Sequence, residues 1–204
     1  GQNYLTISID RGAIARYVAS EITYVGLELG EHRFRPFSAE WVLGHRIGDC
    51  KDTAALLVAL YESVGIPARM VLLRITDEGP FPARLAVLEA FNHAIVYLPE
   101  DDLFVDGTAA GHDPALPPAM DQGSTALLVD GADSRLITTP VPGAGGERLR
   151  YRLRPGPTGT VELELESTTT GEAADRRRAA LAGTADPRRV SRWLQSRFPG
   201  AELT

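Results

Sequence analysis

The sequence is poor in thiols and amines: Cys50 is its single cysteine, Lys51 is its single lysine, and the remaining basic residues are arginines. One cysteine excludes any disulfide within the chain, so Cys50 serves either packing or chemistry. The longest apolar stretch, residues 54–60, is far shorter than the roughly 18 residues that a membrane-spanning helix needs. No charged-then-apolar leader opens the sequence. The localisation is therefore undecided: the protein resides either in the cytoplasm or, after removal of a signal, in an extracytoplasmic space.

Positive charge is scarce as well. Acidic residues outnumber basic ones by 27 to 21, which gives a formal net charge of -6. This balance opposes a role in nucleic-acid binding, because domains of that kind usually carry a basic face. A hydrophobic content of 44% with 24% charged residues is typical of a soluble globular chain and not of a disordered one.

Proline and glycine gather in residues 139–146, TPVPGAGG, which is typical of a linker. We therefore predict a core domain over residues 1–138 and a small extension over residues 147–204. The length of the chain agrees with one domain of about 150 residues plus an appendage.

The core is expected to begin with helices and to continue with an antiparallel sheet. Apolar residues at helical spacing predict the helices, and Asp49 is suited to cap the second of them. Runs of β-branched and apolar residues predict the strands, and this order of elements indicates an α+β architecture. The expected core elements are helices over 11–22 and from 49 or 50 to 63, a loop between them, and strands over 68–75, 91–98 and 103–106. The expected elements of the extension are strands over 149–153 and 161–165 and helices over 173–182 and 187–198.

Cys50 lies in the first turn of the predicted helix that ends near residue 63. Free backbone N–H groups and the helix dipole favour an anion at that position, so the thiolate form of Cys50 would be stabilised there. The alternative is that Cys50 packs as a small buried hydrophobic residue, which is the common role of an isolated cysteine.

His93 and Asp106 lie on the two strands that follow the helix. If these strands pair as a hairpin, Leu98 opposes Leu103, and His93 lies diagonal to Asp106 on the same face, within side-chain reach. A carboxylate that orients an imidazole is the usual partner arrangement of a general base. The alternatives are a core histidine satisfied by the backbone and, for Asp106, a turn residue in the run Asp-Gly-Thr.

A thiol, an imidazole and a carboxylate in this chain order form the layout that a papain-like triad requires. The runs that carry them closely resemble the transglutaminase-like domains, and within these the bacterial group in which the core follows a domain of unknown function. The resemblance covers about residues 11–130. The matching runs are ITYVGLELGEHRFRPF, GDCKD followed by AALLVALYESVGIPAR, FNHAIVYL and FVDGT.

This resemblance implies a papain-like fold with Cys50 as nucleophile, His93 as general base and acid, and Asp106 as the residue that orients His93. It implies acyl transfer through a thioester on a peptide or protein substrate, with no cofactor and no metal, and a β-rich tail. The domain that precedes the core in that group is not in this sequence, so the resemblance implies an upstream domain outside it. The oxyanion hole would use the Cys50 N–H and an upstream donor; we choose Tyr24, with a packed aromatic as the alternative.

Three functions remain open at this stage. Hydrolysis of a peptide or amide bond is the expected reaction, because cross-linking needs a site that excludes water and no feature of the sequence indicates one. Amide formation on a protein or on a carrier-bound acyl group is the first alternative. The second is a non-catalytic binding or scaffold module, against which the retention of both Cys50 and His93 argues.

Three nearby features have simpler interpretations. Lys51 should point about 100° around the helix from Cys50, so we expect its side chain to be solvated. A zinc site made of Cys50, His93 and His112 lacks a close ligand pair of the usual spacing. The arginine run at residues 176–178 is expected to form a solvated helix face, with a patch for phosphate or an acidic partner as the minor alternative.

Overall fold

The computed structural model describes residues 10–26, 30–75, 87–142, 145–157, 159–171, 173–174, 177 and 187–200. The chain is an α+β protein, as the sequence predicts. Its helices are α1 (Arg11–Glu21), α2 (Ala39–His45), α3 (Cys50–Ser63) and α5 (Pro187–Arg197), with short 3-10 helices η1 (Gly30–Arg33), η3 (Leu88–Ala90), η4 (Ala119–Asp121) and η5 (Gly131–Asp133). Its strands are β1 (Thr23–Tyr24), β2 (Ile47–Gly48), β3 (Arg69–Leu73), β4 (His93–Leu98), β5 (Leu103–Val105), β6 (Thr125–Leu128), β7 (Arg135–Thr138), β8 (Glu147–Pro155) and β9 (Val161–Thr169).

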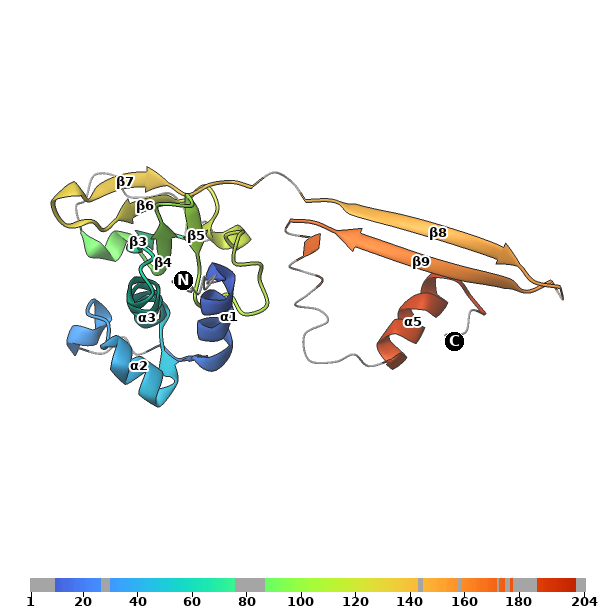
Figure 1. Ribbon diagram of the computed structural model, residues 1–204, viewed down its shortest axis with the longest axis horizontal. Coiled ribbons are helices and arrows are strands. Elements are labelled where there is room, and N and C mark those ends of the chain that lie inside the picture. Colours follow the sequence, from blue (N-terminus) through green and yellow to red (C-terminus); the bar gives the residue numbers. More distant parts are fainter. Residues whose placement is uncertain are drawn as a thin grey trace, which may run out of the picture.

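The central feature is a five-stranded antiparallel sheet in the order β5-β4-β3-β6-β7, with α3 packed against one of its faces (Figure 1). Successive residues of β4 alternate between the two faces, as strand geometry requires. Ala94 and Val96 belong to the buried cluster that contains the α3 residues, whereas Ile95 belongs to a second cluster with Val71 and Leu73. The sheet is therefore buried on both faces at β4, the strand that carries His93.

Two further helices surround α3 (Figure 1). Val18 of α1 and Val42 of α2 are both fully buried in the same cluster as Leu57 of α3. The hydroxyl of the buried Tyr61 donates a hydrogen bond of 2.9 Å to the carbonyl of Arg11, which joins the end of α3 to the start of α1. These contacts hold α3, and with it Cys50, at one place relative to the sheet.

The predicted hairpin register is confirmed: Leu98 lies opposite Leu103, and Val96 lies opposite Val105. The prediction of a loop between the first two expected helices is wrong, because that segment contains β1, η1, α2 and β2. Helix α2 has only seven residues, and Val42 is its only fully buried one, so it leaves no periodic pattern to recognise. It is held instead by the Ser38 side chain, which caps Trp41 N–H at 3.2 Å, and by packing on α3.

The extension forms a separate two-stranded sheet, with α5 beside it (Figure 1). Strands β8 and β9 are longer than predicted, and exposed pairs such as Arg150–Glu166 at 2.8 Å join them. The helix predicted over 173–182 lies largely outside the described residues, and so does most of the run at 176–178. The division into a core, a linker and an extension stays a prediction. Among the described helices, none is both long enough and apolar enough to cross a membrane.

Candidate functional site

Cys50 is the first residue of α3, and a reciprocal capping box fixes the turn that carries it. The Asp49 carboxylate accepts hydrogen bonds from the N–H groups of Lys51 at 3.1 Å and Asp52 at 3.3 Å. In return, the Asp52 carboxylate accepts one from Asp49 N–H at 3.0 Å. The thiol of Cys50 is free and partly exposed, so it is held at the positive end of the helix dipole with access to the surface.

Lys51 is not solvated, so the expectation for its side chain is wrong. The side chain is only 11% exposed, and its ammonium group forms an ion pair with the Asp49 carboxylate, whose own side chain is 1% exposed. The flexible four-carbon stem of lysine lets the ammonium turn back to the N-cap, although Lys51 points away from Cys50 around the helix. The buried pair therefore belongs to the support of the Cys50 turn.

Asp52 and Gly48 explain further why the run GDCKD forms this turn. Asp52 is fully buried, and its second carboxylate oxygen accepts a hydrogen bond of 2.9 Å from Phe37 N–H, in the segment before α2. A Cβ atom on Gly48 would lie 2.8 Å from the Cβ of Asp52. Only glycine lets β2 approach the first turn of α3 this closely.

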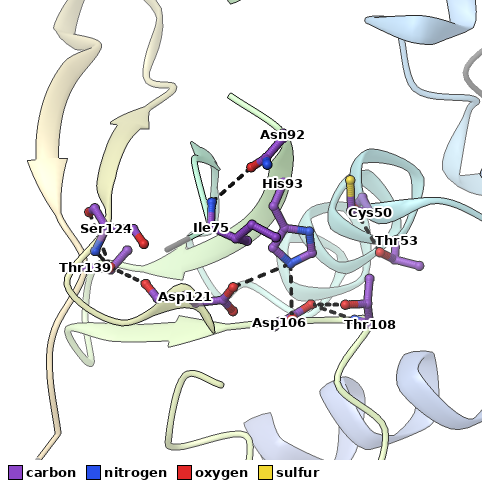
Figure 2. Close-up of polar contacts among 10 residues, drawn as sticks. All are labelled: Cys50, Thr53, Ile75, Asn92, His93, Asp106, Thr108, Asp121, Ser124 and Thr139. Atoms are coloured by element: carbon purple, nitrogen blue, oxygen red, sulfur yellow. Dashed lines mark hydrogen bonds and ion pairs between the residues drawn. The ribbon is translucent and has the colours of Figure 1, made fainter. Parts of the chain in front are cut away.

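His93 begins β4, and the preceding residue anchors it. The N–H of Asn92 donates to the carbonyl of Leu73 at 3.0 Å, and the Asn92 side-chain oxygen accepts from Ile75 N–H, also at 3.0 Å (Figure 2). These two bonds fasten the start of β4 to the end of β3. The imidazole is thereby held at the start of β4, on the side of the first turn of α3.

The structure brings His93 and Asp106 together. Nε2 of His93 lies 3.2 Å from Oδ2 of Asp106, and both side chains are buried (Figure 2). The other carboxylate oxygen of Asp106 accepts two hydrogen bonds from Thr108, one from its N–H at 2.7 Å and one from its hydroxyl at 2.8 Å. Both carboxylate oxygens of Asp106 therefore have a hydrogen-bond partner, which restricts the orientation of the carboxylate.

Gly107 lets this strand end approach α3. A Cβ atom at this position would lie 2.8 Å from Cδ1 of the fully buried Leu57 and 3.3 Å from Cβ of Thr53. Both neighbours belong to the helix that begins with Cys50. The glycine after Asp106 thus sets the separation between the carboxylate strand and the thiol helix.

The surroundings of His93 favour the charged ring. Burial by itself lowers the pKa of His93, but hydrogen bonds with Asp106 and with the Cys50 side chain outweigh this effect. Together with the negative charges of Asp106 and Asp121, they raise the pKa of His93 to about 10. The imidazole is therefore protonated at neutral pH. Because Nε2 is directed at Asp106, Nδ1 is the ring nitrogen left for Cys50 (Figure 2).

The comparison with protein families agrees with this geometry. Residues 11–102 match the model of the transglutaminase-like superfamily. This segment is a transglutaminase-like domain. The match contains Cys50 and His93 and ends before Asp106, and it supports a papain-like, cysteine-based activity in general terms. No curated protein and no solved structure matches the chain.

Tyr24 lies on β1 of the transglutaminase-like domain. The two residues of β1 pair in parallel with β2, and Tyr24 lies opposite Gly48, two positions before Cys50. Tyr24 as a whole is 56% exposed. The pairing brings Tyr24 next to the strand that leads into the Cys50 turn, and its role as a donor stays a prediction.

Asp121 adds a second buried carboxyl group that sequence reasoning missed. It ends η4, and its Oδ1 lies 3.8 Å from Nε2 of His93 (Figure 2). The segment before it is rich in proline and has no periodic pattern, so no signal in the sequence links it to His93. Ligand atoms of His93, Asp106 and Asp121 all lie within 4.8 Å of one another.

That spacing would also suit a divalent cation. We interpret His93 and Asp106 as hydrogen-bond partners and not as metal ligands, since they share a direct hydrogen bond of 3.2 Å. The zinc alternative considered for Cys50, His93 and His112 is not formed, because the grouping found among the described residues includes neither Cys50 nor His112.

A cavity of about 680 Å³ lies beside the transglutaminase-like domain's first helix, between α1 and residues 109–118. Asp106 contributes to its wall, whereas Cys50 and His93 do not. We therefore do not assign the reacting part of a substrate to this cavity.

Proposed function

We propose that this protein is a cysteine hydrolase that cleaves peptide or amide bonds through a thioester acyl-enzyme. Cys50 is the nucleophile, His93 is the general acid and base, and Asp106 orients His93. The observation that carries the proposal is the 3.2 Å hydrogen bond between buried His93 and Asp106, on a ring whose pKa the Cys50 side chain also raises. A nucleophile, a base and a group that orients the base are the components of covalent acyl transfer.

The reaction divides into two steps. The Cys50 thiolate attacks the carbonyl carbon, the C–N bond breaks, and the His93 imidazolium gives its proton to the departing amine. Water then attacks the thioester carbon while neutral His93 accepts a proton from it. The C–S bond breaks, the acid product leaves, and Cys50 returns as a thiolate beside the imidazolium. The raised pKa of His93 favours this ion pair as the resting state.

Hydrolysis is favoured over amide formation because the Cys50 thiol is only partly covered. Water at high concentration reaches such a site and competes with any amine for the thioester. Analysis of the products with and without an added primary amine distinguishes the two reactions: an amide product that dominates over the acid would replace hydrolysis by amide formation.

The oxyanion hole would use the backbone N–H of Cys50 and the hydroxyl of Tyr24. The Cys50 N–H has no acceptor among the residues that the structure describes, so it is available to a developing oxyanion. Tyr24 on β1 lies opposite Gly48, close to the same turn.

Tyr24→Phe is expected to lower kcat by about 100-fold, which is the usual effect of removing one oxyanion donor. Alkylation of Cys50 forms no oxyanion, so its rate should stay at the wild-type value. The two rates are measured on the same preparation. An unchanged kcat would show that Tyr24 is not an oxyanion donor.

The first test of the proposed function follows the rate at which iodoacetamide alkylates Cys50 between pH 4 and 9, by intact mass. An unperturbed thiol with a pKa of about 8.5 is roughly 0.3% ionised at pH 6. A thiolate held by the His93 imidazolium should therefore react up to about 300-fold faster than the His93→Ala variant at that pH. The difference between the two proteins should shrink as the pH approaches 9, where an unperturbed thiol is mostly ionised as well.

His45→Ala is the matched control, because His45 is an exposed histidine on α2. It should label like the wild type. If wild type and His93→Ala label equally slowly and only near pH 8, the enzyme proposal fails, and a binding or scaffold module becomes the better interpretation. If the thiolate is present, a library of peptide amides, with Cys50→Ala as the inactive reference, identifies the substrate.

A further inference from the structure

Asp121 has an unusual environment for a carboxyl group. It is fully buried, and neither of its side-chain oxygens has a hydrogen-bond donor within the described part of the chain. Its nearest titratable neighbours are Asp106, which follows β5, and His93, on β4. An ionised carboxylate buried without a donor is strongly disfavoured, and such a group usually keeps its proton.

The backbone of Asp121 is held by a small buried network. The hydroxyl of Thr139 donates to the carbonyl of Asp121, and Ser124 N–H donates to the Thr139 hydroxyl at 2.9 Å (Figure 2). Thr139 is 1% exposed. The carboxyl group is thus aimed at the pair of His93 and Asp106 by a fixed support, and is not an incidental loop side chain.

The two neighbouring carboxyl groups differ in their affinity for a proton. Burial raises the pKa of Asp106, but hydrogen bonds from His93 and Thr108 and the charge of His93 outweigh it, so the pKa ends below its ordinary value. Asp121 has no such donors. Burial and the negative charge of Asp106 raise the pKa of Asp121 to about 7, although the charge of His93 opposes them. Two adjacent carboxyls with separated pKa values divide the roles of acid and base between them.

We propose that Asp121 is a positioning residue that, as a neutral carboxylic acid, donates a hydrogen bond to Asp106 and keeps Asp106 directed at Nε2 of His93. The protonation of Asp121 follows from its position in the fold and does not require catalysis. The effect of this protonation on catalysis rests on the proposed function.

The sign of the pH dependence follows from this arrangement. Below pH 7 Asp121 is neutral and donates to Asp106. Above pH 7 it ionises, the donor is lost, and a second negative charge appears beside the imidazolium, which makes His93 a weaker acid toward the leaving group. Turnover should therefore begin to decline near pH 7. Asp121→Asn keeps an N–H donor at every pH, so its turnover should stay level until His93 itself loses its proton.

The direct test is a ¹³C NMR titration of the full chain labelled at its aspartate carboxyl carbons, in wild type and Asp121→Asn. We expect one carboxyl signal that titrates near pH 7 in the wild type and is missing in the variant. The proposal is overturned if every aspartate is ionised above about pH 5. It is also overturned if metal analysis of the purified protein finds one equivalent of a divalent ion that Asp121→Asn no longer holds. Neither readout requires turnover, so a failure of the proposed function would be recognised separately.

Alkylation of Cys50 supplies the functional test at pH 6. Asp121→Ala should label about tenfold more slowly than wild type, which corresponds to one lost hydrogen bond to a charged group. Asp121→Asn should recover most of that loss, whereas a merely space-filling role would be restored equally well by Asp121→Leu. Equal rates in the Asn and Leu variants would refute the positioning role. If Asp121→Ala does not fold, the comparison of Asn with Leu remains decisive.

Discussion

Asp106→Asn is expected to lower the turnover of the proposed hydrolysis by about 10⁴-fold with little change in the fold. Thr108 donates two hydrogen bonds to Oδ1 of Asp106, so the amide oxygen of an asparagine would take that place. The amide NH₂ group would then face Nε2 of His93, where Oδ2 now accepts. An N–H donor at this point stabilises the imidazole tautomer that carries its proton on Nδ1, which cannot accept a proton from Cys50.

The measurement compares kcat of wild type and Asp106→Asn on a cleaved peptide amide, together with their thermal unfolding. Asp133→Asn is the matched control, because Asp133 lies in η5 on the surface and should leave kcat unchanged. A loss smaller than about tenfold in Asp106→Asn would show that Asp106 does not select the His93 tautomer. The orienting role would then have to be given up even if Cys50 is the nucleophile.

Lys51→Met is expected to lower the free energy of unfolding by about 3–5 kcal/mol, because it leaves the charge of Asp49 buried without its cation. The side chains of Lys51 and Asp49 are only 11% and 1% exposed. Asp49 retains the N–H groups of Lys51 and Asp52 as donors, but these do not carry the compensating full charge. Since Asp49 caps α3, we expect the turn that carries Cys50 to lose order along with stability.

Urea unfolding at pH 7, followed by circular dichroism, measures this change. Arg152→Met is the matched control: it removes the cation of an exposed cross-strand pair with Glu164, at 3.3 Å, in which both side chains are 56% exposed. Exposed pairs contribute about 0–1 kcal/mol, so this variant should differ little from the wild type. Similar losses in the two variants would contradict the idea that burial makes the Lys51–Asp49 pair important.

The parts of the site that the sequence predicts correctly depend on local interactions. The run GDCKD contains its own N-cap, since Asp49 and Asp52 bind each other's backbone within one turn, and the helix therefore begins at Cys50. The short turn between β4 and β5 sets their register, so pairing Leu98 with Leu103 places His93 near Asp106 before any coordinates are known.

Other features depend on contacts between distant segments, which leave no local pattern. Helix α2 has one fully buried residue and is held by packing on α3. Lys51 looks like a solvated residue on a helical wheel, and only the path of its stem back to Asp49 shows that it is buried. The proposed roles of Cys50, His93, Asp106 and Tyr24 await the experiments described above.

By itself, the sequence determined the α+β class, the helix whose first turn carries Cys50, the hairpin that brings His93 near Asp106 and the likeness to transglutaminase-like domains, because these depend on runs of neighbouring residues. The tertiary structure alone decided that Asp121, 28 residues beyond His93 in the chain, brings a second carboxyl group 3.8 Å from the same imidazole nitrogen. Burial is the physical reason for the difference. A local sequence pattern predicts which side chains lie close together. Whether each side chain is charged depends on how deeply the complete fold buries it.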